Sequence, residues 1–172
     1  AHAKLYYCSK FASWTNTMIP QKLDTKHDTP RLVIPFIDEQ GKMFGYQGRS
    51  FDPHDKVRYI TIMLQPDKKI FGLDTVNFFK KHYIVEGPID SLFLPNAIAM
   101  GGADINLSIV NADSVFVYDN EPRNLEIVKR MQNILDSGYS ICIWPKDLKY
   151  KDINDMVLGG INPKETIDNN TY

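Results

Sequence analysis

Three acidic residues, Glu86, Asp119 and Glu121, have the types and spacing of a cation site. Glu86 and Asp119 each end a short apolar run typical of a β-strand, and in open α/β sheets ligands bind beyond the carboxyl ends of the strands. Glu121 lies two residues after Asp119, so in an extended segment both side chains face the same side. Mg²⁺ prefers oxygen ligands and commonly joins carboxylates to substrate phosphates, which favours phosphoryl-transfer chemistry.

A plainer interpretation is that these acids cap helices or pair with Lys and Arg. For one acid at a strand end, that interpretation is the stronger of the two. Three such acids, with a Gly87-Pro88 turn after the first and a Gly101-Gly102 pair at the end of a later strand, favour a cation site.

The residues around these acids predict a mainly parallel α/β sheet in residues 80–172, because apolar runs alternate there with helical patterns. Pro88 suits the first position of a helix, and Gly138 suits the end of the clearest one. In that clearest helix Leu125, Val128, Met131 or Gln132, and Leu135 fall at helical spacing. We expect strands at 81–86, 97–102, 114–119 and 139–145, and helices at 88–94, 121–138 and 151–160.

The preceding part of the chain, residues 1–79, predicts a small strand-rich subdomain that is mainly antiparallel. Residues 31–51 consist of two β-rich runs around a turn with Gly41, which is typical of a hairpin. Alternation of polar and apolar residues from Val57 to Leu64 predicts a further strand. Residues 1–30 give no clear pattern. The whole chain is therefore expected to combine an α+β subdomain with an α/β domain.

The composition is that of a globular protein, with 172 residues, 43% apolar and 24% charged. A net charge of −1 argues against binding nucleic acid by bulk charge, but it is compatible with a local basic surface. We find neither a secretory signal nor an apolar run of about 18 residues, and we expect a cytoplasmic protein (in the host cytoplasm if a phage encodes it). Ala1 is not a natural initiator, so we expect a piece of a longer chain.

The two cysteines, Cys8 and Cys142, have no Cys or His at metal-ligand spacing. We expect two structural thiols, and we expect no zinc to be bound by this chain alone, because structural zinc takes four ligands.

Four segments resemble the Toprim motifs in order and spacing. "YIVEGPIDSL" resembles the first motif, "IAMGGAD" the glycine-bearing strand end, "VFVYDNEPRN" the Asp-x-Asp motif and "YKDINDMV" a segment that follows in primases. Upstream, "RLVIPFIDEQGKMFGYQGRSF", "VRYITI" and "KKIFGLD" are similar to segments of bacterial and phage DNA primases. The chain is therefore identified as a Toprim-type DNA primase core, and "EGPIDSLFLPNAI" is most similar to primases of T-even-type phages.

The resemblance implies roles for matching residues. Glu121 stands where relatives have a second Asp, and Asn154 stands where many have an acid, so both positions leave the number of metals open. The implied catalytic acids are Glu86, Asp119 and Glu121; the implied metal ligands are these three and Asp152; Asp90 is a secondary acid; Arg49, Arg58 and Lys68 bind nucleotide or template.

The resemblance also implies an activity. It implies a DNA-directed RNA polymerase that makes short RNA primers on single-stranded DNA for replication, by metal-dependent nucleotidyl transfer. The cofactor would be Mg²⁺ or Mn²⁺, the substrates ribonucleoside triphosphates, and the partners a replicative helicase and a zinc-binding primase domain that this chain lacks. Two alternatives stay open, a Toprim nuclease and a non-catalytic Toprim module that binds DNA.

Other residues have plainer interpretations. His82 is expected at the surface or in a cap rather than in catalysis. Phe44, Tyr46 and Phe51 could stack on bases, although core or hairpin-face positions are favoured. Arg123 is expected to pair with an acid, although it could reach a triphosphate.

Overall fold

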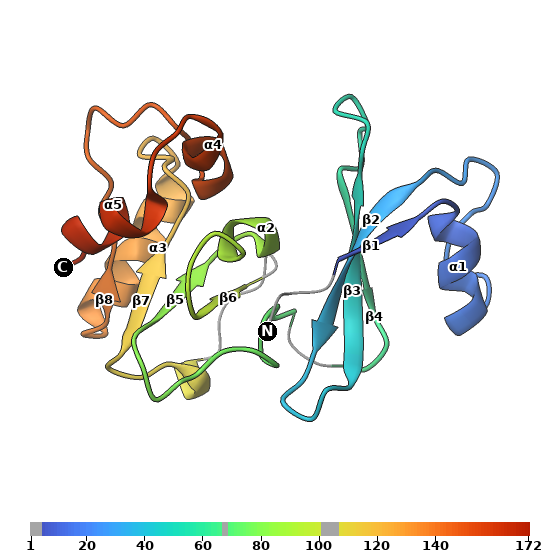
Figure 1. The fold of residues 1–172 in the computed structure, drawn as a ribbon, viewed down its shortest axis with the longest axis horizontal. Coiled ribbons are helices and arrows are strands. Elements are labelled where there is room, and N and C mark those ends of the chain that lie inside the picture. The colour runs from blue at the N-terminus through green and yellow to red at the C-terminus, as the bar shows by residue number, and fades with distance from the viewer. Residues whose placement is uncertain (1–4, 67–68, 101–106) are drawn as a thin grey trace. The chain divides into compact units, whose positions relative to one another are not determined.

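The computed structural model describes residues 5–66, 69–100 and 107–172. The chain divides into two compact units, Ala1–Lys69 and Ile70–Tyr172, and each is described by itself (Figure 1). This division falls ahead of the expected one at residue 79, because Ile70, Leu73, Val76 and Phe78 pack into the core of the second unit. No helix in the described ranges is both long and apolar enough to cross a membrane.

The first unit is built on an antiparallel sheet with the strand order β1-β2-β3-β4. The predicted hairpin is confirmed as β2 and β3, and Gly41 in its turn has φ +81°, a conformation that favours glycine. The strand predicted after it is confirmed as β4. The bounds are Tyr6–Cys8 for β1, Arg31–Ile37 for β2, Met43–Ser50 for β3 and Tyr59–Met63 for β4.

A helix that the sequence did not reveal, α1 (Phe11–Met18), closes the core of this unit. The Phe11 ring lies where a Cβ on Gly48 would have to be, so glycine at 48 lets the helix approach β3. The Tyr46 hydroxyl, fully buried, donates a 2.9 Å hydrogen bond to Thr15 Oγ1. Phe44 is also buried, whereas Phe51 is 55% exposed.

A buried cation, Arg31, ties the strands of the first unit to the loop after β3. Its guanidinium donates to the carbonyl oxygens of Gly48, Val57 and Arg58, and it forms a 2.9 Å ion pair with Asp55. Only 6% of the Arg31 side chain is exposed, so these partners replace the water that the charge loses on burial.

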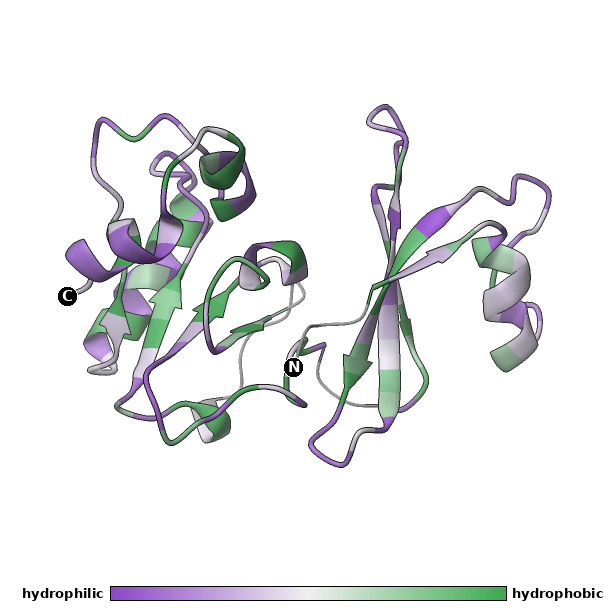
Figure 2. Ribbon diagram, viewed as in Figure 1, coloured by the Kyte–Doolittle hydropathy of each residue, from purple (hydrophilic) through white to green (hydrophobic). Residues whose placement is uncertain are grey.

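The second unit contains the predicted parallel sheet, with the order β6-β5-β7-β8. Hydrophobic colouring runs through β5 and β6 in Figure 2, as expected for strands covered on both faces. The 3-10 turn Leu107–Ile109 precedes β7. The strands are β5 (His82–Val85), β6 (Ala97–Ala99), β7 (Ser114–Val117) and β8 (Ser140–Ile141).

Helices lie on both faces of this sheet, with α3 behind it and α5 in front (Figure 1). In α3 the buried positions are Ile127 and Ile134, whereas Leu125 is 82% exposed. Two apolar stripes share this helix, and the stripe with the two isoleucines faces the sheet core. The helices are α2 (Pro88–Ser91), α3 (Leu125–Asp136), α4 (Ile153–Leu158) and α5 (Pro163–Asn169); α2 is shorter than expected and α5 was not predicted.

His82 is fully buried in β5, so its expected surface position was wrong. One ring nitrogen lies 2.7 Å from the Ser114 hydroxyl on β7 and the other 2.9 Å from the Lys80 carbonyl oxygen. A histidine whose two ring nitrogens both have hydrogen-bond partners can be buried in a central strand. The polar residue type alone therefore did not predict its burial. Cys8 and the buried Cys142 are both free thiols, as predicted.

Candidate functional site

Two of the predicted acids meet at the carboxyl edge of the parallel sheet. Glu86 directly follows β5, and Asp119 comes shortly after β7, which pairs with β5 in register. The backbone N–H of Asp119 donates a 2.7 Å hydrogen bond to Glu86 Oε2. The pairing of the two strands therefore fixes the distance between the two acids.

Asp119 lies in an unusually acidic environment. The pKa of this carboxyl is raised to about 8, chiefly by burial and also by the negative charges of Glu86, Asp90 and Asp152. The positive charge of Lys151 opposes the shift. The fold thus brings four of the predicted acids into mutual electrostatic range, with the Lys151 ammonium group near them.

Asp90 and Asp152 lie at the N-terminal ends of two short helices, Asp90 in the first turn of α2 and Asp152 as the N-cap of α4. Asp90 Oδ1 accepts a 2.8 Å hydrogen bond from the backbone N–H of Asn154, which joins α2 to α4. A Cβ at Gly87 would lie 2.5 Å from Asp90 Oδ2, so the glycine provides the room for this carboxylate. Asp152 caps α4 and accepts a 2.8 Å hydrogen bond from the Asp155 N–H.

Glu121, the third predicted catalytic acid, is engaged elsewhere. Its Oε1 forms a 2.6 Å ion pair with Lys151, and its Oε2 accepts a 2.8 Å hydrogen bond from the side chain of Asn124, the N-cap of α3. The hydrogen bonds from Lys151 and then Asn124 lower the pKa of Glu121, and Glu121 in turn raises the pKa of Lys151. Lys151 was visible in the "YKDINDMV" motif, but no role was assigned to it.

The described residues include no group of three or more acidic, His or Cys side chains already arranged to hold a metal ion. The charges nevertheless fit one. A buried carboxyl with a pKa of about 8 beside three further carboxylates lacks positive charge, and a hard divalent cation would provide it.

The predicted basic residues lie in the first unit. The Arg49 guanidinium stacks over the Tyr59 ring at 5.7 Å, and the exposed Arg58 donates to the Pro53 carbonyl oxygen at 3.3 Å. Lys68 lies outside the described residues. The acids lie in the second unit, so the geometry of each set stands by itself.

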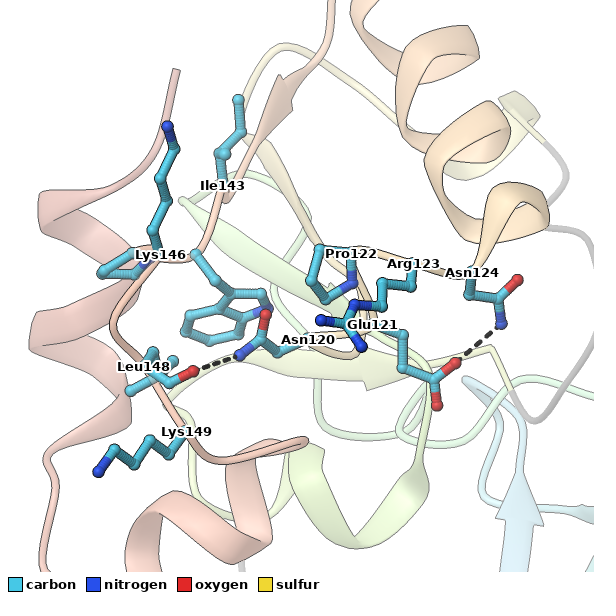
Figure 3. Close-up of a pocket in the computed structure, with 11 residues that line it drawn as sticks. Asn120, Glu121, Pro122, Arg123, Asn124, Ile143, Lys146, Leu148 and Lys149 are labelled. Atoms are coloured by element: carbon cyan, nitrogen blue, oxygen red, sulfur yellow. Dashed lines mark hydrogen bonds between the residues drawn. The ribbon is translucent and has the colours of Figure 1, made fainter.

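Asn120, between two of the acids, joins the loops after β7 and β8. Its side-chain amide donates to the carbonyl oxygen of Leu148 (Figure 3) and to that of Tyr150. Its backbone N–H donates to the carbonyl oxygen of Lys151. These loops border a groove of about 980 Å³ beside Glu121. The sequence did not predict this connection between the loops, because no sequence pattern marks an Asn between two acids as a hydrogen-bonding link.

The fold matches the catalytic cores of bacterial primases. The Aquifex aeolicus primase structure with zinc-binding and RNA polymerase domains gives a TM-score of 0.66 at 18% identity, covering 98% of this chain and 51% of that chain. The RNA polymerase domain of Mycobacterium tuberculosis primase DnaG gives 0.64 at 14% identity, covering 91% and 66%. A DnaG primase catalytic domain bound to single-stranded DNA gives 0.61 at 14% identity, covering 92% and 60%.

The two sheets and the acidic edge, together with the sequence similarity, point to one class: the chain resembles the DNA primases. It is similar to the DNA primase of Enterobacteria phage T4, with 36% identity over 169 residues, 95% of this chain. The chain spans about half of that relative, 49% of its length. No family model matches the chain.

Proposed function

We propose that this chain is the RNA polymerase core of a DNA primase, which joins ribonucleotides on a single-stranded DNA template. The observation that carries the proposal is the buried Asp119 carboxyl at the edge of the parallel sheet, bonded through its N–H to Glu86. An acid site at the carboxyl ends of parallel strands suits metal-dependent phosphoryl chemistry. The similarity to a DNA primase supports nucleotidyl transfer among such reactions.

The cofactor would be Mg²⁺ or Mn²⁺, held by Asp119, Glu86 and Asp152, with Asp90 as a secondary acid. Once bound, the ion would neutralise charge that develops on the triphosphate of the incoming nucleotide. Glu121 remains a predicted ligand, and it would have to exchange Lys151 for the cation. Until then the pair keeps a positive ammonium group beside the acids.

The template would be single-stranded DNA and the substrates ribonucleoside triphosphates. The DnaG catalytic domain with the matching fold is described as bound to single-stranded DNA, which supports this choice. Arg49, Arg58 and Lys68 would contact phosphates, since Arg offers paired donors to phosphate oxygens. The proposed protein partners are a replicative helicase and a zinc-binding primase domain supplied from outside this chain.

The test is an assay of primer synthesis with single-stranded DNA, ribonucleotides and Mn²⁺. We expect Asp119→Ala to lower the rate at least about 100-fold, or about 2.7 kcal/mol in activation free energy. Asp136→Asn, which removes an exposed acid at the other end of α3, is the matched control and should leave the rate unchanged. Priming that persists in Asp119→Ala would refute the site.

Two further measurements separate the alternatives. DNA degradation in the absence of ribonucleotides would identify a nuclease instead. A protein whose melting temperature does not respond to Mn²⁺, in wild type as in Glu121→Ala, would be a non-catalytic binding module.

A further inference from the structure

The groove beside Glu121 has a composition that the acidic site does not explain. It lies in the second unit between the loop after β7 and the loop after β8, with a volume of about 980 Å³. Apolar surface from Ile143, Trp144 and Leu148 lines it together with three cationic side chains, Arg123, Lys146 and Lys149. A cleft that combines cations with an aromatic side chain is typical of single-stranded nucleic-acid binding.

The three cations are available for a ligand. All three are exposed, and within the described part of the chain none of them forms an ion pair or a side-chain hydrogen bond. Arg123 was expected to pair with an acid, but Glu121 pairs with Lys151 instead. Among the described residues that line the groove, Glu121 is the one acid, so the groove is locally positive in a chain of net charge −1.

The arrangement of these cations favours a strand over a single nucleotide. In Figure 3, Lys146 and Lys149 extend away from each other along the loop after β8, while Arg123 faces them from the loop after β7. In this arrangement the two ammonium groups would face different phosphates rather than one triphosphate. Charges spread along a trough suit the successive phosphates of a polynucleotide.

The walls of the groove are held in place. The Trp144 indole N–H donates a 2.7 Å hydrogen bond to the Tyr118 carbonyl oxygen, which fixes the ring relative to the end of β7. Asn120 bonds to both Leu148 and Tyr150, so the two walls are linked directly. A fixed aromatic surface offers a base a stacking partner at a low entropic cost.

We propose that this groove binds a stretch of single-stranded polynucleotide, with its phosphates on Arg123, Lys146 and Lys149 and its bases toward Trp144. The proposal rests on the proposed function, because it places the strand next to the acids that would act on it. Template DNA and product RNA share the required chemistry, a flexible phosphate backbone with free base faces.

The test measures strand binding in EDTA without ribonucleotides, so that it needs no catalysis. Dye-labelled oligo-dT and oligo-rU of equal length are titrated with wild-type protein over a series of salt concentrations. Lys146→Ala/Lys149→Ala removes two groove charges, and Lys80→Ala/Lys129→Ala removes two exposed charges elsewhere on the same unit. The groove variant should reduce the slope of log affinity against log salt by about 1.4, at about 0.7 per lost phosphate contact, and the control should not.

The identity of the affected polymer decides the source of the strand. A reduced slope with oligo-dT assigns the groove to template, and one with oligo-rU assigns it to product. In a Trp14→Phe background Trp144 is the remaining tryptophan, and binding should quench its emission.

Wild-type protein that binds neither polymer at low salt, or groove and control variants with equal slopes, would overturn the proposal. Unchanged Trp144 emission on binding would overturn it as well. Asp119→Ala should keep strand binding in EDTA while losing priming, so failure of the groove and failure of the catalytic site give different results.

Discussion

The backbone N–H of Asp119 donates its hydrogen bond to the carboxylate of Glu86, so one predicted metal-site acid positions another. Glu86→Gln would keep an oxygen acceptor for this bond and remove a negative charge. We expect the pKa of Asp119 to fall from about 8, because one repelling charge is lost, and to stay above its ordinary value of 3.8, because burial is the larger cause. A carbon-detected NMR titration of the metal-free protein measures both, and an unchanged pKa would contradict the coupling.

The second prediction concerns Gly87, whose missing side chain leaves space for the Asp90 carboxylate. Gly87 has φ −100° and ψ 135°, an extended conformation open to alanine, so Gly87→Ala should cost little backbone strain. Its Cβ would displace the Asp90 carboxylate and weaken the bond to the Asn154 N–H. We expect a melting temperature close to wild type and a priming rate reduced at least about tenfold, about 1.4 kcal/mol.

The control for this variant is Asp90→Asn, which keeps the oxygen acceptor and loses the charge. Similar losses in both would assign the effect to the carboxylate. Full activity in Gly87→Ala would show that the position of Asp90 is unimportant.

The attachment of α5 to the sheet should depend on pH. Burial alone would raise the pKa of Asp168, but hydrogen bonds from Lys164, Lys81 and Tyr83 outweigh it and lower the pKa to about 2. The unfolded value is near 3.8, so this carboxylate stabilises the folded state above pH 3.8 and loses that contribution as the pH falls toward 2.

Asp168→Asn should therefore have a lower melting temperature than wild type at neutral pH. Near pH 2 the melting temperatures of variant and wild type should lie closer together. The matched control is Glu165→Gln, an exposed acid on the same helix, which should change neither value appreciably. If Asp168→Asn lowered the melting temperature by the same amount at both pH values, the stabilising role of the Asp168 negative charge would be contradicted.

Arg31 gives a prediction about the first unit. Lysine cannot reach three carbonyl oxygens and a carboxylate from a single ammonium group as the planar guanidinium does. We expect Arg31→Lys to lower the free energy of unfolding by about 2–3 kcal/mol, because buried carbonyl groups lose their donor. Urea denaturation measures this, with Arg130→Lys on the surface of α3 as a control expected within about 0.5 kcal/mol.

The elements that the sequence predicted well are those with strong periodic patterns. The hairpin around Gly41, the apolar strands and the helix ending before Gly138 were recovered because alternation, helical spacing and glycine punctuation each have a direct physical cause. The helix α1 and strand β1 were missed, because both depend on contacts between residues far apart in the chain. Phe11 of α1 packs on Gly48, and β1 pairs with β2.

The candidate site was predictable as a set of acids but not as a set of bonds. Strand ends placed Glu86 and Asp119 together, since parallel pairing alone fixes that edge. The ion pair between Glu121 and Lys151 depends on the path of the loop after β8, which places Lys151 near Glu121. Residue spacing in the sequence does not predict that path. Helical spacing likewise did not show which side of α3 faces the core, because the helix carries two apolar stripes and tertiary packing decides between them.

The side-chain amide of Asn120 joins the loop after β7 to the loop after β8, so the two loops should move as one rigid unit. When a ligand contacts one loop, the other loop is already in its binding position, so the loops should need little rearrangement before the ligand binds. Association should then approach the rate set by encounter, and dissociation should carry most of the differences in affinity between ligands. Shortening this side chain would convert a preformed groove into one that must assemble around each ligand.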